Sequence, residues 1–209
     1  MRDPNKAAAI NALLADLARA AIGSTFNQFR ERGADDVPDA PAIRIANLRS
    51  YLAERQGAEI LAVGEAAGYR GMRWSGIAFT SEFDLLERWR GGPYRRSSLR
   101  DRLWKEPSGT IVHSILEELS AESRVILWNT VPTHPHLEGN SLSNRRPTRD
   151  EIIAGRVFVE RMVDIMQPRV LVGIGRVACE ALPAAQYVRH PAQSGATSFR
   201  AGMRQILTG

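Results

Sequence analysis

Apolar positions along this chain follow two spacings, which predict strands and helices in alternation. Short continuous apolar runs are typical of buried strands and occur at 60–63, 124–129, 169–174 and 186–189. Apolar residues spaced three or four positions apart predict helices over 5–20, 43–56, 81–90, 108–120, 148–167 and 176–182, with a last helix near the C-terminus. This alternation predicts an α/β fold with a central parallel four-stranded sheet and helices on both faces.

We expect a single domain over 1–209, in which a helical part at 1–57 precedes a sheet core at 58–209. Polar residues mark where two of the core helices begin. Thr148 and Glu151 have the spacing of a capping box. Ser81 stands before acidic residues, as at a helix N-terminus.

Composition excludes several classes of protein. At 209 residues and 44% hydrophobic, the chain is long enough for a full core. No apolar run approaches the ~20 residues that cross a membrane, and the alanine-rich, charged N-terminus is unlike a signal peptide. Cys179 is the only cysteine, which excludes a disulfide framework and a cysteine zinc site. We expect no metal or cofactor and, by default, a cytoplasmic location.

The net charge of +5 comes almost entirely from arginine. Arginine grips phosphate in a bidentate fork, so a polyanionic partner is one interpretation and an arginine-preferring genome is the other. No acidic residue follows Glu180, whereas Arg189, His190, Arg200 and Arg204 do, as expected for a surface that faces phosphates. A second basic segment, at 88–102, could be either a loop that faces DNA or a solvated basic face.

A glycine-rich stretch at 59–82 follows the first predicted strand and is the most informative part of the sequence. Its glycines allow sharp turns and close approach of a ligand to the backbone. It also carries Arg70, Arg73, Trp74 and Phe79. Such a loop after a strand is typical of ligand sites in open α/β sheets, although a surface loop that covers the sheet edge is the alternative.

A second glycine motif, Gly173-Ile-Gly-Arg-Val-Ala178, fits the spacing of dinucleotide-binding turns. That fingerprint belongs at the first strand of its unit and needs an acidic residue about 20 positions later for the ribose. No acidic residue follows Glu180, so we expect these glycines to serve close helix–sheet packing instead.

Polar residues lie at the ends of three predicted strands: Gly64-Glu65, Asn129 and His190. The carboxyl ends of parallel strands meet at one edge of the sheet, so these groups could form one pocket. Taken singly, each has an ordinary explanation as a cap, an Asx turn or a loop histidine. Their joint occurrence with Phe79 favours a shared site.

With these motifs the chain resembles the uracil-DNA glycosylase superfamily over residues 58–206. The first motif is Gly64-Glu-Ala-Ala-Gly68 with Gly76-Ile-Ala-Phe79, similar to the GEAPG…GxPF of the thermophile-type branch. The second, Leu127-Trp-Asn129, resembles the strand-ending asparagine that reads uracil. The third, His190-Pro-Ala192, resembles the HPS loop. The order of the three motifs is more specific than any one of them.

The resemblance implies a role for each matched residue. Phe79 would stack on a flipped uracil, Asn129 would read its polar edge, and His190 would donate a hydrogen bond to O2 as negative charge collects there. Gly64 to Gly68 would form the wall where water attacks the sugar, and within this stretch Gly64 and Ala66 are expected to contact the base. We expect further DNA contacts from Arg70, Arg73, Gln193, Ser194 and Arg200.

The sequence departs from this family in three ways. Ala66 stands where the best-known branch has its water-activating aspartate, which leaves Glu65 as the nearby carboxylate. One cysteine cannot hold the iron–sulfur cluster of another branch. The third motif has no leucine to wedge into DNA, so Gln193 or another residue must do so.

We therefore expect a monomeric, monofunctional hydrolase that removes uracil, and perhaps other deaminated bases, from DNA in base-excision repair. His190 and Glu65 are its expected catalytic residues. Two alternatives stay open at this point: a nucleic-acid-binding relative without catalysis, and an α/β protein that binds a small nucleotide.

Overall fold

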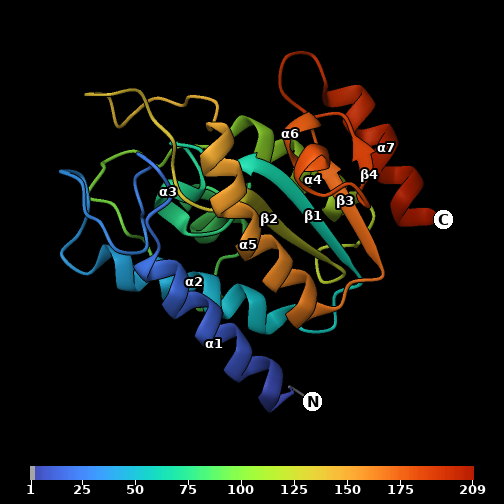
Figure 1. Ribbon diagram of the computed structural model, residues 1–209, viewed down its shortest axis with the longest axis horizontal. Coiled ribbons are helices and arrows are strands. Elements are labelled where there is room, and N and C mark those ends of the chain that lie inside the picture. The colour runs from blue at the N-terminus through green and yellow to red at the C-terminus, as the bar shows by residue number, and fades with distance from the viewer. Residues whose placement is uncertain (1–2) are drawn as a thin grey trace.

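The computed structural model describes residues 3–209 and contains the predicted parallel sheet (Figure 1). Its strands are β1 (Ile60–Ala66), β2 (Val125–Val131), β3 (Val170–Ile174) and β4 (Gln186–Val188). They lie in the order β2-β1-β3-β4 and every pair is parallel, which confirms the predicted fold class.

The helices also follow the predicted order. They are α1 (Pro4–Arg19), α2 (Ala40–Glu54), the short α3 (Met72–Ser75), the π-helix η1 (Asp84–Arg88), α4 (Pro107–Glu118), α5 (Arg149–Met166), α6 (Arg176–Ala181) and α7 (Ala196–Thr208). The capping box of α5 is confirmed: the Glu151 amide donates to Thr148 Oγ1 at 3.2 Å, and the Thr148 amide donates to Glu151 Oε2 at 2.8 Å.

Helices cover both faces of the sheet. Every residue of β2 is buried, which requires cover on each side. The helix α5 packs along β2 and lies in front of the sheet in Figure 1, and α6, which contacts α5, packs on the same face against β1, β2 and β3. The helix α7 packs against β4, and α4 against α7. The edge of β2 is closed by α2, since the Leu127 amide donates to the Tyr51 hydroxyl at 2.8 Å.

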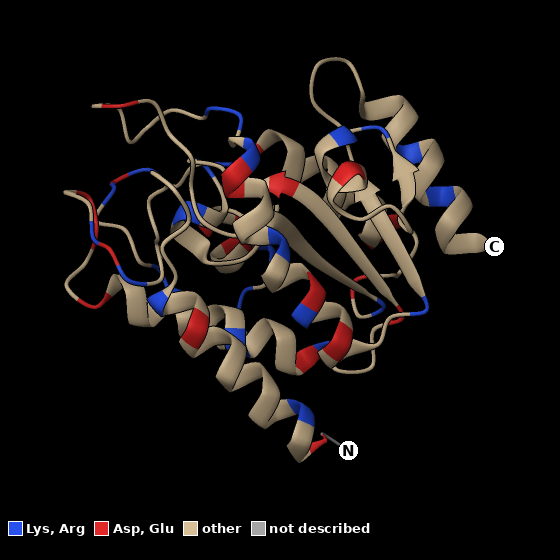
Figure 2. Cartoon of the chain, viewed as in Figure 1, with Lys and Arg blue, Asp and Glu red and all other residues tan. Residues whose placement is uncertain are grey.

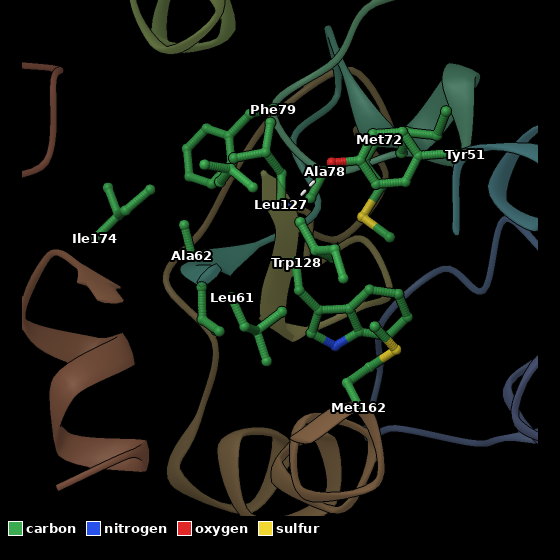
Figure 3. Packing of buried hydrophobic residues seen from close by; sticks show 14 of the residues in the cluster. Tyr51, Leu61, Ala62, Met72, Ala78, Phe79, Leu127, Trp128, Met162 and Ile174 are labelled. Carbon is green, nitrogen blue, oxygen red and sulfur yellow. Dashed lines mark hydrogen bonds between the residues drawn. The ribbon is translucent and has the colours of Figure 1, made fainter. Parts of the chain in front are cut away.

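The core fixes which way the end of β2 faces. Trp128 is fully buried, and Figure 3 shows its ring beside Met162 of α5. Removing a buried aromatic of this size typically costs about 3–5 kcal/mol, so Trp128 is a main anchor of the strand. Successive side chains of a strand point to opposite faces. Asn129 therefore points away from α5.

The helix expected over 81–90 and the ends of two strands differ from the prediction. The helix expected over 81–90 contains a π-helical turn, in which the Trp89 amide donates to the Asp84 carbonyl at 2.9 Å. Ser81 Oγ donates to Asp84 Oδ2 at 2.6 Å, and the ring of Trp89 stacks on Tyr51 with centroids 6.0 Å apart. This ring packing accompanies the wider turn. The strands β1 and β2 also run beyond their predicted ends, to Ala66 and Val131.

Candidate active site

A pocket of about 670 Å³ opens at the carboxyl ends of the strands. The first, second and third sequence motifs all reach it, and so does the long loop between β2 and α5. Its lining includes Glu65, Ala66, Gly68, Phe79, Glu106, Asn129, Asn144, Arg146, His190 and Gln193. Most of the predicted site residues therefore converge on one cavity.

Gly64 makes this convergence possible. The register of the sheet places it beside Asn129, so both residues face the same side. A β-carbon on Gly64 would lie 2.6 Å from Phe79 Cε2 and 2.7 Å from Asn129 Oδ1, closer than real contacts allow. Only glycine permits the ring and the amide to meet over this strand.

Phe79 is held in a conformation that is rare for a bulky residue. Its φ is 53°, in the left-handed region, and its side chain is 5% exposed. Ser75 Oγ fastens the loop by donating to the Thr80 carbonyl at 2.6 Å. Gly109 of α4 packs directly on the Phe79 backbone, where a β-carbon would lie 2.9 Å from the carbonyl carbon. Such local strain persists where surrounding structure enforces it, often at functional sites.

Asn129 offers the pocket a largely unused amide. Its side chain is 3% exposed, and Nδ2 approaches Met72 Sδ at 3.2 Å. A thioether sulfur is a weak acceptor, so the amide keeps most of its capacity for a ligand. Asn129 lies within β2, two positions before its end, whereas the sequence placed it as the last residue of the strand.

His190 is a neutral donor. Its Nδ1 accepts a hydrogen bond from the Ala192 amide at 3.2 Å, so the proton of the neutral ring lies on Nε2. Burial, helped by the neighbouring Arg189, holds the pKa of His190 below its usual value. The ring lies 6.2 Å from that of Phe79, centroid to centroid. The Nε2–H group is thus available to a ligand beside the aromatic ring.

Glu65 lies on the other side of β1. Because side chains alternate along a strand, Glu65 points away from the face that Gly64 shares with Asn129. Burial raises the pKa of Glu65, Arg146 lowers it, and Glu180 of α6 raises it further. The carboxyl still reaches the rim of the pocket, but from the α6 side of the sheet.

The predicted DNA contacts separate into two groups. Arg70 is exposed beside Tyr69, and Gln193 and Ser194 form an exposed turn with φ of 52° and 61°. Arg200 is turned toward α4, where it donates to Ser114 Oγ at 2.5 Å. The exposed residues can meet a ligand, whereas Arg200 lies outside the pocket lining.

Arg73 does not reach the surface, which corrects its predicted place. It is 3% exposed and its guanidinium donates to both oxygens of Asp36, at 3.2 and 3.1 Å. Arg44, fully buried, also pairs with Asp36. The positive charge of Arg73 is therefore paired with a buried carboxylate and does not face DNA. The sequence showed a basic residue in a glycine-rich loop but not its partner far upstream.

The loop between β2 and α5 supplies residues that sequence reasoning missed. His134 donates from Nδ1 to the Ala67 carbonyl at 2.8 Å, and Asn144 Oδ1 accepts from the Tyr69 amide at 3.0 Å. These bonds tie the loop to the first motif. They bring Asn144 and Arg146 to the pocket, whereas Arg145 is held by Glu151 in a bidentate pair. The turn-rich composition of the loop gave no signal for this arrangement.

Gly173 is a packing glycine, as the sequence indicated. A β-carbon there would lie 3.1 Å from the Cys179 amide nitrogen, and the Cys179 thiol occupies the space above it. Gly175, Arg176 and Val177 of the same turn line the pocket that the three motifs share. A nucleotide ribose would still lack its acidic partner, because no acidic residue follows Glu180.

Arg176 and Arg189 line the C-terminal part of the pocket, whereas Arg200 and Arg204 of α7 pair with Glu118 of α4. Figure 2 shows basic but no acidic positions along α7, in agreement with the acid-free sequence after Glu180.

In residues 3–209, no three His, Cys, Asp or Glu side chains are grouped as a metal site would require. None of the described helices is long and apolar enough to cross a membrane.

Comparisons with known proteins agree with this geometry. A family model described as the uracil DNA glycosylase superfamily matches residues 53–206. Among solved structures, the chain is similar to the crystal structure of wild-type SMUG2 from Pedobacter heparinus. The TM-score is 0.62 over 95% of each chain at 11% identity, a likeness that shows the fold. No curated protein sequence matches the chain.

Proposed function

The chain belongs to the uracil DNA glycosylase superfamily, and from that premise we propose that it removes uracil from DNA by hydrolysing the N-glycosidic bond. The observation that carries the proposal is the meeting of Phe79, Asn129 and His190 around the bare backbone of Gly64. An aromatic face, a planar amide and a neutral N–H donor are the three groups that an extruded uracil needs.

Base recognition is assigned to Phe79 and Asn129. Flipping a base out of the stack costs a few kcal/mol, of which an aromatic platform returns part. The Asn129 amide has one acceptor and one donor on a plane, a pair that distinguishes uracil from cytosine. Both groups are buried and held by neighbouring elements, so binding needs little ordering of either side chain.

Leaving-group stabilisation is assigned to His190. Breaking the glycosidic bond leaves a uracil anion, whose charge collects at O2. The Nε2–H group of the neutral His190 ring can donate to that oxygen as the charge develops. A preorganised donor of this kind acts as an oxyanion hole does, and losing one typically costs about 10²–10³ in rate.

DNA contacts are assigned to exposed groups around the pocket mouth. The exposed Arg189 and Gln193 line the pocket, and Arg146 lies on the lining near Glu65. Ser194 is exposed next to Gln193, and Arg70 is exposed two residues after the lining residue Gly68. Arginine contacts with phosphate position a nucleic acid without reading its sequence. We propose a monomer that acts in the cytoplasm on uracil-containing DNA in base-excision repair.

The rival function is a relative that binds nucleic acid without catalysis, and the observation that favours it is the methyl side chain of Ala66 at the usual place of the water-activating acid. One experiment separates the two. The protein is incubated with an oligonucleotide that contains a single uracil, and abasic sites are then cleaved with alkali.

Strand breaks at uracil that are absent from a matched thymine oligonucleotide and much slower with a His190→Ala protein support the glycosylase. Binding without breaks at any enzyme concentration supports the rival and contradicts the proposal.

A further inference from the structure

A second carboxyl lines the same pocket, and sequence reasoning missed it. Glu106 immediately precedes α4 and is half-buried. Its Oε2 is shut off from solvent and has no hydrogen-bond partner. A β-carbon on Gly71 would lie 2.5 Å from the carboxyl carbon of Glu106, so glycine at this position makes room for the acid.

Glu106 does not do what its place in the sequence suggests. A residue at a helix N-cap commonly accepts a hydrogen bond from its own helix, but the Glu106 side chain makes no such bond. Instead it lies over the turn after β1, with Oε1 at 3.6 Å from the β-carbon position of Gly68. Burying a polar group without a partner costs free energy, which a substrate can return by supplying the partner.

Glu106 approaches the face of β1 that Glu65 does not. Gly64 and Ala66 point to the face that holds Phe79 and Asn129, since alternate residues of a strand share a side. The helix that Glu106 begins packs on the Phe79 backbone through Gly109. A carboxyl is thus delivered from α4 to the side of the strand where Ala66 offers only a methyl group.

We propose that Glu106 activates the attacking water, in place of a carboxylate at position 66. This inference rests on the proposed glycosylase function. Ionised Oε1 accepts a proton from water as the water oxygen bonds to the sugar C1′. The C1′–N1 bond breaks, and its electron pair leaves with uracil as an anion that His190 stabilises. The products are an abasic sugar and uracil, which takes its proton from solvent, and Glu106 returns the proton it accepted to solvent.

The surroundings of Glu106 fix its protonation. Burial, with a smaller contribution from the negative charge of Asp84 on η1, raises the pKa of Glu106 to about 8. Other charged groups nearby are engaged elsewhere: Lys105 lies over the Phe83 ring, Arg73 pairs with Asp36, and the exposed Arg70 lies over Tyr69. A base with a pKa near the working pH is well matched to proton abstraction.

This protonation predicts a pH profile. With a pKa of about 8, roughly one Glu106 in ten is ionised at pH 7 and nine in ten at pH 9. The single-turnover rate on a uracil oligonucleotide should therefore rise about tenfold over that range. His190 does not contribute to the rise, because burial lowers its pKa and leaves the ring neutral throughout.

Glu106→Gln keeps the shape of the side chain but cannot accept the proton. We expect it to lose about 10²–10⁴ in single-turnover rate, with a flat pH profile between 7 and 9 and unchanged affinity for the uracil oligonucleotide. Glu160→Gln, an exposed change on α5, is the matched control and should keep the wild-type rate and profile. Glu106→Asp, which keeps a carboxyl but withdraws it, should retain a pH-dependent remnant.

The melting temperature of Glu106→Gln at two pH values tests whether the substitution acts through the protonation of Glu106 or through a general loss of stability. The folded pKa of Glu106 is raised above its ordinary value of 4.5, so its stabilising contribution is present below about pH 4.5 and is lost as pH rises toward about 8. Glu106→Gln should therefore melt at a higher temperature than the wild type at pH 8, and the gap should narrow at pH 5.

Different results would refute the glycosylase function and the role of Glu106. A wild-type protein that cleaves no uracil DNA refutes the glycosylase function itself. A wild type that cleaves, together with a Glu106→Gln protein within tenfold of its rate and with the same pH profile, overturns only the role of Glu106.

Discussion

The two faces of β1 differ sharply at the carboxyl end of the strand. One face, at Gly64 and Ala66, has almost no side chain of its own and is filled by Phe79 and Asn129 from other elements. The other face carries Glu65, whose charged neighbours are Arg146 and Glu180. The first motif thus contributes space on one face and charge on the other. The reacting groups come from elsewhere in the chain.

This comparison teaches that neighbouring residues in a motif can serve different surfaces. Glu65 stands next to Gly64 in sequence, yet strand alternation directs it to the α6 side of the sheet. Glu106 is far away in sequence and reaches the bare face through α4. If the bare face holds the reaction, substitutions there should act strongly and those on the charged face weakly.

Among the site residues identified from the sequence, the largest effect is expected for His190→Ala. Without the Nε2–H donor, the uracil anion loses its hydrogen bond, and the single-turnover rate should fall about 10²–10³-fold. Uracil affinity should change less, because the donor acts mainly as charge develops. A variant that retains most of its rate would show that the leaving group is stabilised by another residue.

Gly64→Ala should act through space alone. The added methyl group would displace the Phe79 ring and the Asn129 amide, and a shift of about 1 Å in a positioning group can cost about 10²-fold in rate. Gly57→Ala, near the other end of the strand, is the matched control, because a β-carbon there meets nothing within 4 Å. Equal activity of the two variants would show that the ring and the amide do not bind the base.

Phe79→Ala should weaken binding more than chemistry. Stacking of a base on an aromatic ring is worth about 1–3 kcal/mol, so affinity for a uracil oligonucleotide should fall roughly ten- to a hundredfold. Titration by fluorescence anisotropy measures this directly, with Phe79→Tyr as the conservative control. Unchanged affinity in Phe79→Ala would place the extruded base elsewhere.

Glu65→Gln should have the smallest effect on the rate. Its carboxyl lies on the charged face, so we expect less than about tenfold loss in single turnover, below the range typical of a general base. The measurement is the same uracil oligonucleotide assay used for His190→Ala. If Glu65→Gln abolishes cleavage while Glu106→Gln retains it, the roles of the two faces are reversed and Glu65 is the base.

The fold could be predicted because its signals are local. Apolar runs and the capping box of α5 located the strands and helices to within a few residues. The strands β1 and β2 run further than predicted because Gly64 and Asn129 pair with one another despite their weak strand preference. The π-helical turn at η1 depends on packing of Trp89 against Tyr51, which no local pattern reveals.

The site was predictable in part for the same reason. Asn129 and His190 follow apolar runs directly, and the structure brings both to the pocket with Phe79. Arg73 was misplaced because its partner, Asp36, lies in a distant connector. Glu106 was missed because its position depends on a glycine at 71, in a different segment of the chain. Residues placed by contacts between distant segments leave no local signal.

The most direct test of the account is base release by the wild-type protein. A duplex with a single uracil is treated with excess enzyme, and free uracil and the DNA strand are quantified before any alkali treatment. We predict one equivalent of free uracil and an intact abasic strand, with no base released from a matched thymine duplex. No release of uracil, or strand cleavage without alkali, would contradict the assignment of this pocket to a monofunctional uracil-DNA glycosylase.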